Sequence, residues 1–266
     1  VRMEGVCLRC VPRNWLASLT AGPLPDWSCE LAWVPQALDA TAIEETSVEP
    51  ERWLIFDSRA KLGAAVAASL EIKAHNCTLV TAGEDATARR AAVREFLSRP
   101  QTKACGVVYL SGLDVDGPTA APDFQAAEAD GWGGVLDVVQ ALSAAGMAKP
   151  PRLWLVTRGA QAVGDRAQPV SLGQSPVWGL GRVIAAEHPE LACTRVDLDP
   201  EAGEAQVQQL IEELWAGQAE DQIAYRDGHR YVARLRRLAH AADAALKLPP
   251  GQPYRLRLRD PPQHEA

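Results

Sequence analysis

Short, continuous runs of apolar residues recur along the chain, separated by longer stretches in which apolar residues lie three or four positions apart. Continuous runs of this length are typical of strands buried on both faces of a sheet. The runs are Trp53–Asp57, Cys77–Thr81, Cys105–Leu110 and Leu153–Thr157. After the first of them, Leu62, Val66 and Leu70 form one apolar face of a helix. Strands that alternate with helices in this way predict an α/β fold with a doubly wound, mostly parallel sheet.

Three later stretches repeat the helical stripe and predict which side of each helix is buried. In the helix before Cys105, we expect Val93, Phe96 and Leu97 inside and Arg89, Arg90 and Arg94 outside. The helix before Leu153 carries the stripe Trp132, Val135, Leu136 and Val139. The clearest amphipathic pattern is Val207, Leu210, Ile211, Leu214 and Trp215.

Residues 175–199 predict a helix followed by a buried strand. Ser175 is a favourable N-cap, and Pro176 suits a first helical position, which needs no N–H. Gly179 and Gly181 each cost about 1 kcal/mol against alanine inside a helix, so we expect another backbone to approach closely there. The apolar face of the helix is Val177, Leu180, Val183 and Ile184, Pro189 ends the helix, and Cys193–Leu198 is the strand.

The two ends of the chain differ from this regular middle part. Asp227-Gly228 predicts a hairpin turn between the strands Ile223–Tyr225 and Tyr231–Leu235, and Cys29–Gln36 predicts one more strand. Several prolines before Cys29 indicate a linker, and a short alternating strand at residues 254–258 lies in a proline-punctuated tail. We therefore divide the chain into residues 1–28, 29–240 and 241–266.

Composition narrows the classes of partner. The chain has 266 residues and a formal net charge of −7, so we expect no nucleic-acid or anionic-membrane partner. It has no apolar run long enough to span a membrane and no signal peptide, which predicts a soluble, cytoplasmic protein. It opens on Val1 rather than methionine, which suggests a piece of a longer polypeptide. Cys7 and Cys10 form a single Cys-x-x-Cys, and because zinc needs four ligands we expect reduced thiols and no metal.

A doubly wound sheet usually binds a nucleotide at a glycine-rich turn after its first strand. The corresponding turn here is Asp57-Ser-Arg-Ala-Lys-Leu-Gly63, in which only Gly63 remains, in the place of the glycine that packs helix on strand. We expect Arg59 and Lys61 to crowd a phosphate, although they could instead bind it by charge. Glu84 and Asp85 follow where a ribose-binding acid would lie, but acids before a helix are commonly caps.

Reductase chemistry of the short-chain type needs a tyrosine acid with a lysine four residues later on the same helical face. Leu113, His229, Leu235 and Leu258 follow the four tyrosines at that distance, so no Tyr-x-x-x-Lys exists. At the expected helix the chain has Trp178 and Arg182, and neither side chain can donate a proton near neutral pH. The sequence therefore predicts that this chain does not catalyse such a reduction.

The remaining candidate groups favour structural roles. The chain has no Gly-x-Ser-x-Gly elbow and no Walker loop. We expect His188 to cap a helix C-terminus rather than act as a base. His75 and His229 are predicted on surface loops, and the cluster Arg234, Arg236 and Arg237 on an exposed strand edge. We assign no catalytic, no cofactor-binding and no metal-ligating residue.

Over residues 29–237, the chain resembles the structural half of the ketoreductase domains of modular type I polyketide synthases and of related fatty-acid synthases. The residues that carry the resemblance, in order, are Leu31–Trp33, Trp53–Asp57, Gly106–Asp114, Leu153–Ala160 and above all Ser175–Asp199. The resemblance implies a truncated Rossmann-like fold, similar to that of short-chain dehydrogenases.

In that family a ketoreductase has two Rossmann-like halves. The second half carries the NADPH loop and the catalytic tyrosine, serine and lysine, and the first binds no cofactor and braces the second. The resemblance implies that this chain is the first half, with NADPH only in the missing catalytic half. Residues 1–27 resemble the tail of a dehydratase, and Tyr254–Asp260 resembles the stretch leading into an enoylreductase. These flanks imply a fully reducing module and, as partners, the catalytic half and both neighbouring domains of a homodimeric synthase.

The sequence is compatible with three functions. The first is a non-catalytic brace, with the helix at residues 175–188 and the terminal hairpin as its interface. The second is an NADPH-binding reductase with an atypical site, which would involve Arg59, Lys61 or Glu84 and depend on Arg182. The third is a free-standing protein that docks between the proteins of a synthase.

Overall fold

The computed structural model describes residues 29–38, 52–72, 75–99, 105–115, 125, 127–164, 170–201, 203, 205–216 and 220–237. The chain divides into one compact unit, Ala32–Arg234, and a second unit made of Val1–Leu31 and Leu235–Ala266. The Cys7–Cys10 pair and the strand predicted at residues 254–258 lie outside the described residues.

The described strands form one sheet that is parallel over most of its width. Its order is β1-β8-β7-β6-β5-β4-β2-β3. Every pairing from β3 to β7 is parallel, and β7 and β8 form the antiparallel hairpin predicted around Asp227-Gly228. The strands are β1 (Cys29–Pro35), β2 (Arg52–Phe56), β3 (Asn76–Val80), β4 (Cys105–Tyr109), β5 (Arg152–Arg158), β6 (Thr194–Leu198), β7 (Gln222–Arg226) and β8 (His229–Arg237).

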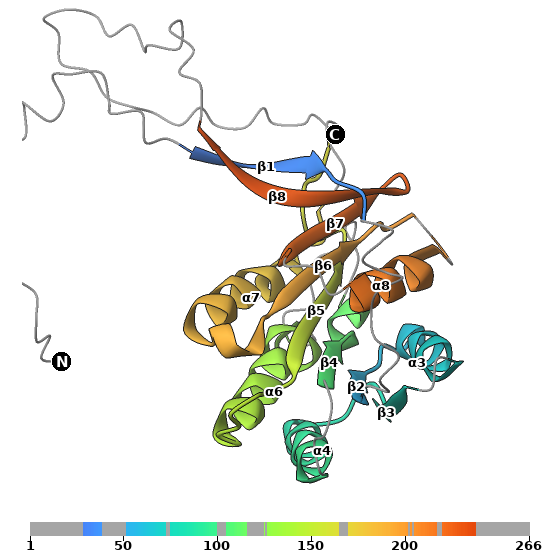
Figure 1. Ribbon diagram of the computed structural model, residues 1–266, viewed down its shortest axis with the longest axis vertical. Coiled ribbons are helices and arrows are strands. Elements are labelled where there is room, and N and C mark those ends of the chain that lie inside the picture. The colour runs from blue at the N-terminus through green and yellow to red at the C-terminus, as the bar shows by residue number, and fades with distance from the viewer. Residues whose placement is uncertain are drawn as a thin grey trace, which may run out of the picture. The chain divides into compact units, whose positions relative to one another are not determined.

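Helices cover both faces of the sheet, which confirms the predicted doubly wound architecture (Figure 1). One core layer lies between the sheet and helices α3 and α8, and the other between the sheet and helices α4, α6 and α7. Trp53 and Ile55 of β2 point into the first layer, whereas Leu54 and Phe56 point into the second. The helices are α3 (Leu62–Ile72), α4 (Ala86–Ser98), α6 (Gly133–Ala144), α7 (Ser175–Glu187) and α8 (Ala205–Ala216), with the short helices η1 (Ser111–Asp114), η2 (Ala127–Trp132) and η3 (Pro189–Leu191).

The sheet is a shortened version of the common dinucleotide-binding arrangement. That arrangement has the strand order 3-2-1-4-5-6, with three strands in its first half. Here β2 and β3 take the places of the first two strands, and β4, which follows next in the chain, pairs with β2 on its other side. Within the described residues no third strand lies beyond β3. The fold is therefore Rossmann-like but truncated on this side.

Several predicted stripes are confirmed, and three residues of the helices were assigned to the wrong side, buried or exposed. Leu62, Val66 and Leu70 of α3 are buried as expected. Arg89 was predicted outside but is buried on α4, because its guanidinium bonds the Asp137 carboxylate and the Ala129 carbonyl oxygen. A long side chain whose charge is paired can be buried in this way.

The other two corrections concern α6 and α7, which lie side by side. Leu136 and Val183 were predicted inside, but they are 39% and 48% exposed. Val138 lies in the buried stripe of α6 instead. Both exposed side chains line a groove between the two helices, which the sheet does not cover.

The start of α7 also differs from the prediction. The N-cap residue is Gln174, one position before Ser175, and the Gln174 amide oxygen accepts the Arg158 N–H at 2.8 Å. The Ser175 hydroxyl donates to the Ser171 carbonyl oxygen at 2.8 Å instead of capping the helix. The helix ends at Glu187, just before Pro189, as predicted.

The two glycines of α7 have different roles, and neither role is the predicted approach of another backbone. A Cβ built on Gly181 would lie within 3.0 Å of side-chain atoms of Arg195 and Leu155, whereas one built on Gly179 meets no atom of the described residues within 4 Å. Gly181 therefore makes room for buried side chains from the sheet. Gly179 contributes no packing that depends on its missing side chain.

We expect Gly179→Ala to stabilise the protein by up to about 1 kcal/mol, because alanine favours the helix and finds open space. Gly181→Ala should instead destabilise it by about 1–2 kcal/mol through overpacking against Arg195. Urea unfolding of the two variants measures both effects. Equal effects of the two substitutions would contradict this difference in packing.

Candidate functional site

The loop after β2 occupies the position where a doubly wound sheet usually binds a phosphate. Asp57 directly follows the strand, and its Oδ1 atom accepts the backbone N–H groups of Ser58 at 2.7 Å and Gly63 at 2.6 Å. A Cβ on Gly63 would lie within 2.9 Å of the Asp57 carboxylate and the Ile55 side chain. Gly63 is therefore the predicted helix-packing glycine, and it packs against a carboxylate of the same loop.

The two cations of this loop lie at its outer side. The backbone N–H of Arg59 donates to both carboxylate oxygens of Asp114, and its largely exposed guanidinium lies 3.5 Å from Asp130. Lys61 is exposed and has φ = 57°, a left-handed conformation that glycine adopts more readily. Both residues border a cavity of about 520 Å³ together with Asp57, Ser58, Ala64 and three residues at the end of β3, Leu79, Thr81 and Ala82. Arg59 and Lys61 therefore line one cavity, which the predicted Glu84 does not border, and the Asp57 carboxylate lines it as well.

Other acids close the same edge of the sheet. The Asp197 carboxylate accepts the Thr157 hydroxyl at 2.6 Å and the Ala160 N–H at 2.8 Å, and it forms an ion pair with Arg226. The Asp199 carboxylate accepts the backbone N–H of Asp227 at 2.7 Å. Since the carboxyl ends of parallel strands share one edge, these acids and Asp57 bind the N–H groups that an anionic ligand would otherwise use there.

The helix that should carry the catalytic pair presents structural residues. Trp178 is buried, and its ring meets that of Trp33 edge-on at 5.9 Å between centroids. Arg182 is exposed, and its Nε donates to the Gln222 amide oxygen at 3.1 Å. Their spacing of four residues places them where a tyrosine and a lysine are required, and neither provides an acidic proton.

Two of the tyrosines are buried and hydrogen-bonded. The Tyr109 hydroxyl donates to the Asp130 carbonyl oxygen at 2.7 Å, and burial raises its pKa. The Tyr225 hydroxyl donates to Glu213 at 2.6 Å, and burial together with this carboxylate raises its pKa as well. A general acid in a reductase needs the opposite shift, toward neutral pH. Tyr254 lies outside the described residues.

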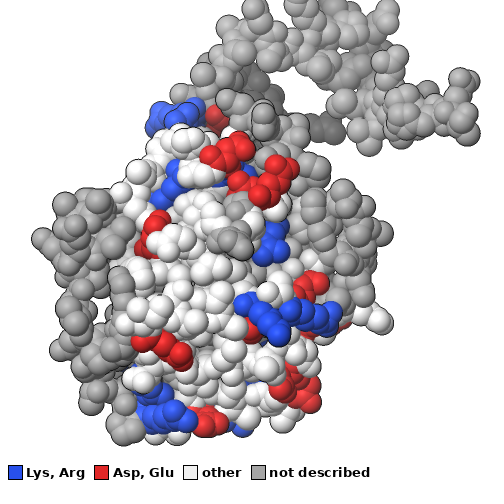
Figure 2. Space-filling model, turned by 90° about the vertical axis from the view of Figure 1, so that its right-hand side faces the viewer, with Lys and Arg blue, Asp and Glu red and all other residues white. Residues whose placement is uncertain are grey.

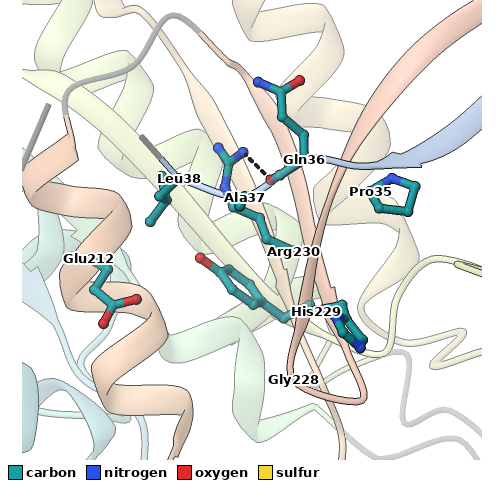
Figure 3. Close-up of a pocket in the computed structure, with 9 residues that line it drawn as sticks. Pro35, Gln36, Ala37, Leu38, Glu212, Gly228, His229 and Arg230 are labelled. Atoms are coloured by element: carbon teal, nitrogen blue, oxygen red, sulfur yellow. Dashed lines mark hydrogen bonds between the residues drawn. The ribbon is translucent and has the colours of Figure 1, made fainter. Parts of the chain in front are cut away.

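A polar cluster under the β7–β8 hairpin fastens the first strand to the sheet. The buried Arg230 forms an ion pair with Glu213 of α8 and donates to the Gln36 carbonyl oxygen at 3.0 Å, and the Gln36 N–H donates to the Arg230 carbonyl oxygen at 3.0 Å. Figure 3 shows the contact between Arg230 and Gln36 beside a hollow that His229 also lines. Glu213 is bonded to both Tyr225 and Arg230, and Arg230 is bonded to Gln36. We call this set of contacts, which holds the end of β1 to the sheet, the clamp.

The remaining predicted candidates take structural positions. Asp85 is the N-cap of α4 and accepts the Ala88 N–H at 2.8 Å, while Glu84 accepts the Thr81 hydroxyl. His188 is the C-cap of α7, and its Nδ1 lies 3.0 Å from Glu190. His75 lies outside any helix or strand, as predicted, and is half-buried, whereas His229 is exposed but is the first residue of β8 rather than a loop residue. In the arginine cluster on β8, Arg234 is half-buried and pairs with Glu220, whereas Arg236 and Arg237 are exposed.

The sequence interpretation missed the buried charges. Arg195 and Asp197 lie inside β6 and are buried, and each pairs with a residue far along the chain. A signal was available, because a charged residue inside a short apolar run has to find a partner when it is buried. The partners themselves, Asp221 and Arg226, follow only from the strand order.

Surface features bear on the class of partner. On the face seen in Figure 2, acidic and basic side chains lie in small groups of both signs separated by uncharged surface. Nucleic-acid binding relies on a continuous basic surface. Among the described residues, no cluster of three or more acidic, histidine or cysteine side chains is suited to a metal ion. No helix in the described ranges has the length and apolar character needed to cross a bilayer.

The sequence of this chain matches one known protein family over most of the described fold. A family model described as the Rossmann fold domain of the polyketide synthase extender module SpnB matches residues 31–235. The chain belongs to this family. The SpnB-type Rossmann domain so defined contains every described element, from β1 to β8, apart from the outer ends of these two strands.

Relatives of this SpnB-type domain are segments of large synthases. The chain is 36% identical over 209 residues to a component of the phenolphthiocerol/phthiocerol polyketide synthase of Mycobacterium tuberculosis, a match that covers 77% of this chain and 9% of that protein. It is 34% identical over 213 residues to the pikromycin polyketide synthase component PikAII of Streptomyces venezuelae, covering 79% and 6%. The chain therefore spans less than a tenth of these relatives.

Solved ketoreductases share the fold of the SpnB-type domain over part of their length. The structure of a C2-type ketoreductase from a modular polyketide synthase matches with a TM-score of 0.62 and 28% identity, over 81% of this chain and 45% of that one. An A1-type ketoreductase matches with a TM-score of 0.61 and 26% identity, over 84% and 45%. More than half of each ketoreductase thus has no counterpart in the match.

Proposed function

We propose that this SpnB-type domain is the non-catalytic half of a ketoreductase, which braces the catalytic half and holds neighbouring domains in place while a polyketide chain is reduced. The observation that carries the proposal is the helix α7. At the spacing where the reaction needs a tyrosine and a lysine, Trp178 packs against Trp33 and Arg182 bonds Gln222. Both side chains contact other residues of the fold, and neither can donate a proton near neutral pH.

The loop after β2 supports the same proposal. A dinucleotide would place its pyrophosphate against the N–H groups at the start of α3. The Asp57 carboxylate already accepts two N–H groups of this loop and would repel a phosphate. The loop residues therefore do not fit a dinucleotide, and we place NADPH in the catalytic half alone.

The groove between α6 and α7 is our candidate for the interface with that half. It has a volume of about 330 Å³ and is lined by Val139, Leu180 and Ile184 in addition to the exposed Leu136 and Val183. Exposed apolar side chains that line one groove are typical of a protein interface. The match covers 45% of each solved ketoreductase. The remaining part of such a ketoreductase is therefore at least as large as this domain, and it is the partner that we propose for the groove.

The wider setting follows the sequence resemblance. We infer a fully reducing module in which a dehydratase precedes residues 29–240 and an enoylreductase follows them, within a homodimeric synthase. The compact unit Ala32–Arg234 lies inside this middle segment.

Co-expression with the catalytic half of the same synthase tests the brace. We expect a complex of the two halves, and a dissociation constant about 30-fold higher when Leu136→Asp and Val183→Asp are combined, because charges replace apolar side chains at its centre. Ile72→Asp, at an exposed apolar position on α3 on the opposite face of the sheet, is the control and should leave the affinity unchanged.

Two outcomes would contradict the proposal. One is failure of the folded halves to associate at micromolar concentration. The other is saturable NADPH binding by this chain alone, followed by the fluorescence of the reduced nicotinamide. That result would favour a reductase with an atypical site at Arg59 and Lys61.

A further inference from the structure

The loop Asp57–Gly63 has the parts of an oxyanion site. The N–H groups of Ser58 and Gly63 converge on one point, and a carboxylate oxygen lies on that point at 2.7 and 2.6 Å. Gly63, in the first turn of α3, has no side chain that would block the approach of this oxygen. Converging N–H groups at the start of a helix are the usual donors to a bound phosphate.

The surroundings of this point also suit an anion. Within the described part of the chain the Ser58 hydroxyl has no hydrogen-bond partner, although Ser58 is only 2% exposed. The adjoining cavity of about 520 Å³ opens beside Lys61 and beside Arg59, whose guanidinium also lies 3.5 Å from Asp130, so an incoming anion would pass the Lys61 ammonium group. These features are independent of the two N–H groups, and Ser58, Arg59 and Lys61 line the same cavity as Asp57.

We propose that the loop Asp57–Gly63 is an oxyanion site filled by the chain's own Asp57 carboxylate, and that removal of this carboxylate opens the site to a phosphoryl oxyanion. The carboxylate supplies the negative charge and the acceptor atoms that a nucleotide's diphosphate group would otherwise bring. Phosphate is excluded by an internal group, while the donors that would bind it are retained. This inference concerns the loop alone and holds whether or not the domain braces a catalytic half.

The test compares variants of the full chain by calorimetric titration with inorganic pyrophosphate. The wild-type chain should show no binding up to about 10 mM. Asp57→Gly should bind with a dissociation constant of about 1 mM or lower, since it frees both N–H groups and the space of the carboxylate. Asp57→Asn should not bind, because its amide oxygen still accepts the two N–H groups and its volume is retained.

Further variants separate a specific site from general attraction. Lys61→Gln added to Asp57→Gly should weaken binding several-fold, and higher salt should do the same, since part of the attraction is electrostatic. Asp85→Gly is the matched control. Asp85 caps α4 through the Ala88 N–H but does not line this cavity, so its removal should create no binding.

The inference is overturned if wild-type chain binds pyrophosphate as tightly as Asp57→Gly does. It is equally overturned if Asp57→Gly, or Asp57→Ser should the glycine variant not fold, keeps the native circular dichroism spectrum and binds no pyrophosphate at about 10 mM. Equal binding by Asp85→Gly would also overturn it, because the effect would then belong to any uncapped helix.

Discussion

Asp197→Ala should lower the free energy of unfolding by about 3–5 kcal/mol, the range for removing one partner of a buried ion pair. Asp197 is fully buried, and its carboxylate bonds Thr157, Ala160 and Arg226. Alanine leaves the Arg226 guanidinium, whose side chain is 3% exposed, without its counter-charge. It also leaves the Ala160 N–H without its acceptor.

Urea unfolding followed by tryptophan fluorescence measures this loss. Glu220→Gln is the control, because Glu220 also pairs with an arginine, Arg234, but at the surface. Surface ion pairs contribute about 1 kcal/mol or less, so the control variant should stay close to wild type. A similar loss in both variants would show that burial does not determine how much the Asp197–Arg226 pair contributes to the free energy of unfolding.

Gly106→Ala is expected to cost about 3 kcal/mol, the upper end of the usual range for overpacking. Gly106 lies on β4 directly opposite Trp53 of β2, and a Cβ there would lie within 2.9 Å of three atoms of the Trp53 indole. Trp53 is buried in the core. Both β2 and β4 have a strand on each side in the sheet, so neither can move aside without disturbing its neighbours.

The matched control is Gly112→Ala. A Cβ at Gly112 would find its nearest neighbour, Val177, at an ordinary distance of 3.7 Å, so we expect a change within about 1 kcal/mol. Thermal unfolding of the two variants gives the comparison. Native stability of Gly106→Ala would mean that the Trp53 ring has room that the packing does not indicate.

Patterns that depend on local chemistry were predictable from the sequence. The stripe of α8 and the hairpin at Asp227-Gly228 are confirmed, because helical spacing and a turn that needs positive φ are properties of neighbouring residues. Arg89 shows the limit of this approach. Its burial depends on Asp137, 48 positions away, and on the contact between α4 and α6 that brings them together.

The candidate site was predictable only in part. The loss of glycines in the loop Asp57–Gly63 and the mismatch at Trp178 and Arg182 are visible in the sequence. The hydrogen bonds from Ser58 and Gly63 to Asp57 are not, because they depend on how the backbone turns between β2 and α3. For the same reason, exposure of Leu136 and Val183 required knowing the spacing of α6 and α7.

The clamp between Gln36 and Arg230 joins the beginning and the end of the domain. Its hydrogen bond joins residues 194 positions apart, and Arg234 also donates to the Gln36 side chain at 2.9 Å. The polypeptide therefore arrives and departs through neighbouring strands at one border of the sheet. The two ends of the domain are therefore neighbours in space. The first strand, β1, can pair with the sheet only after the last strand, β8, has been synthesised.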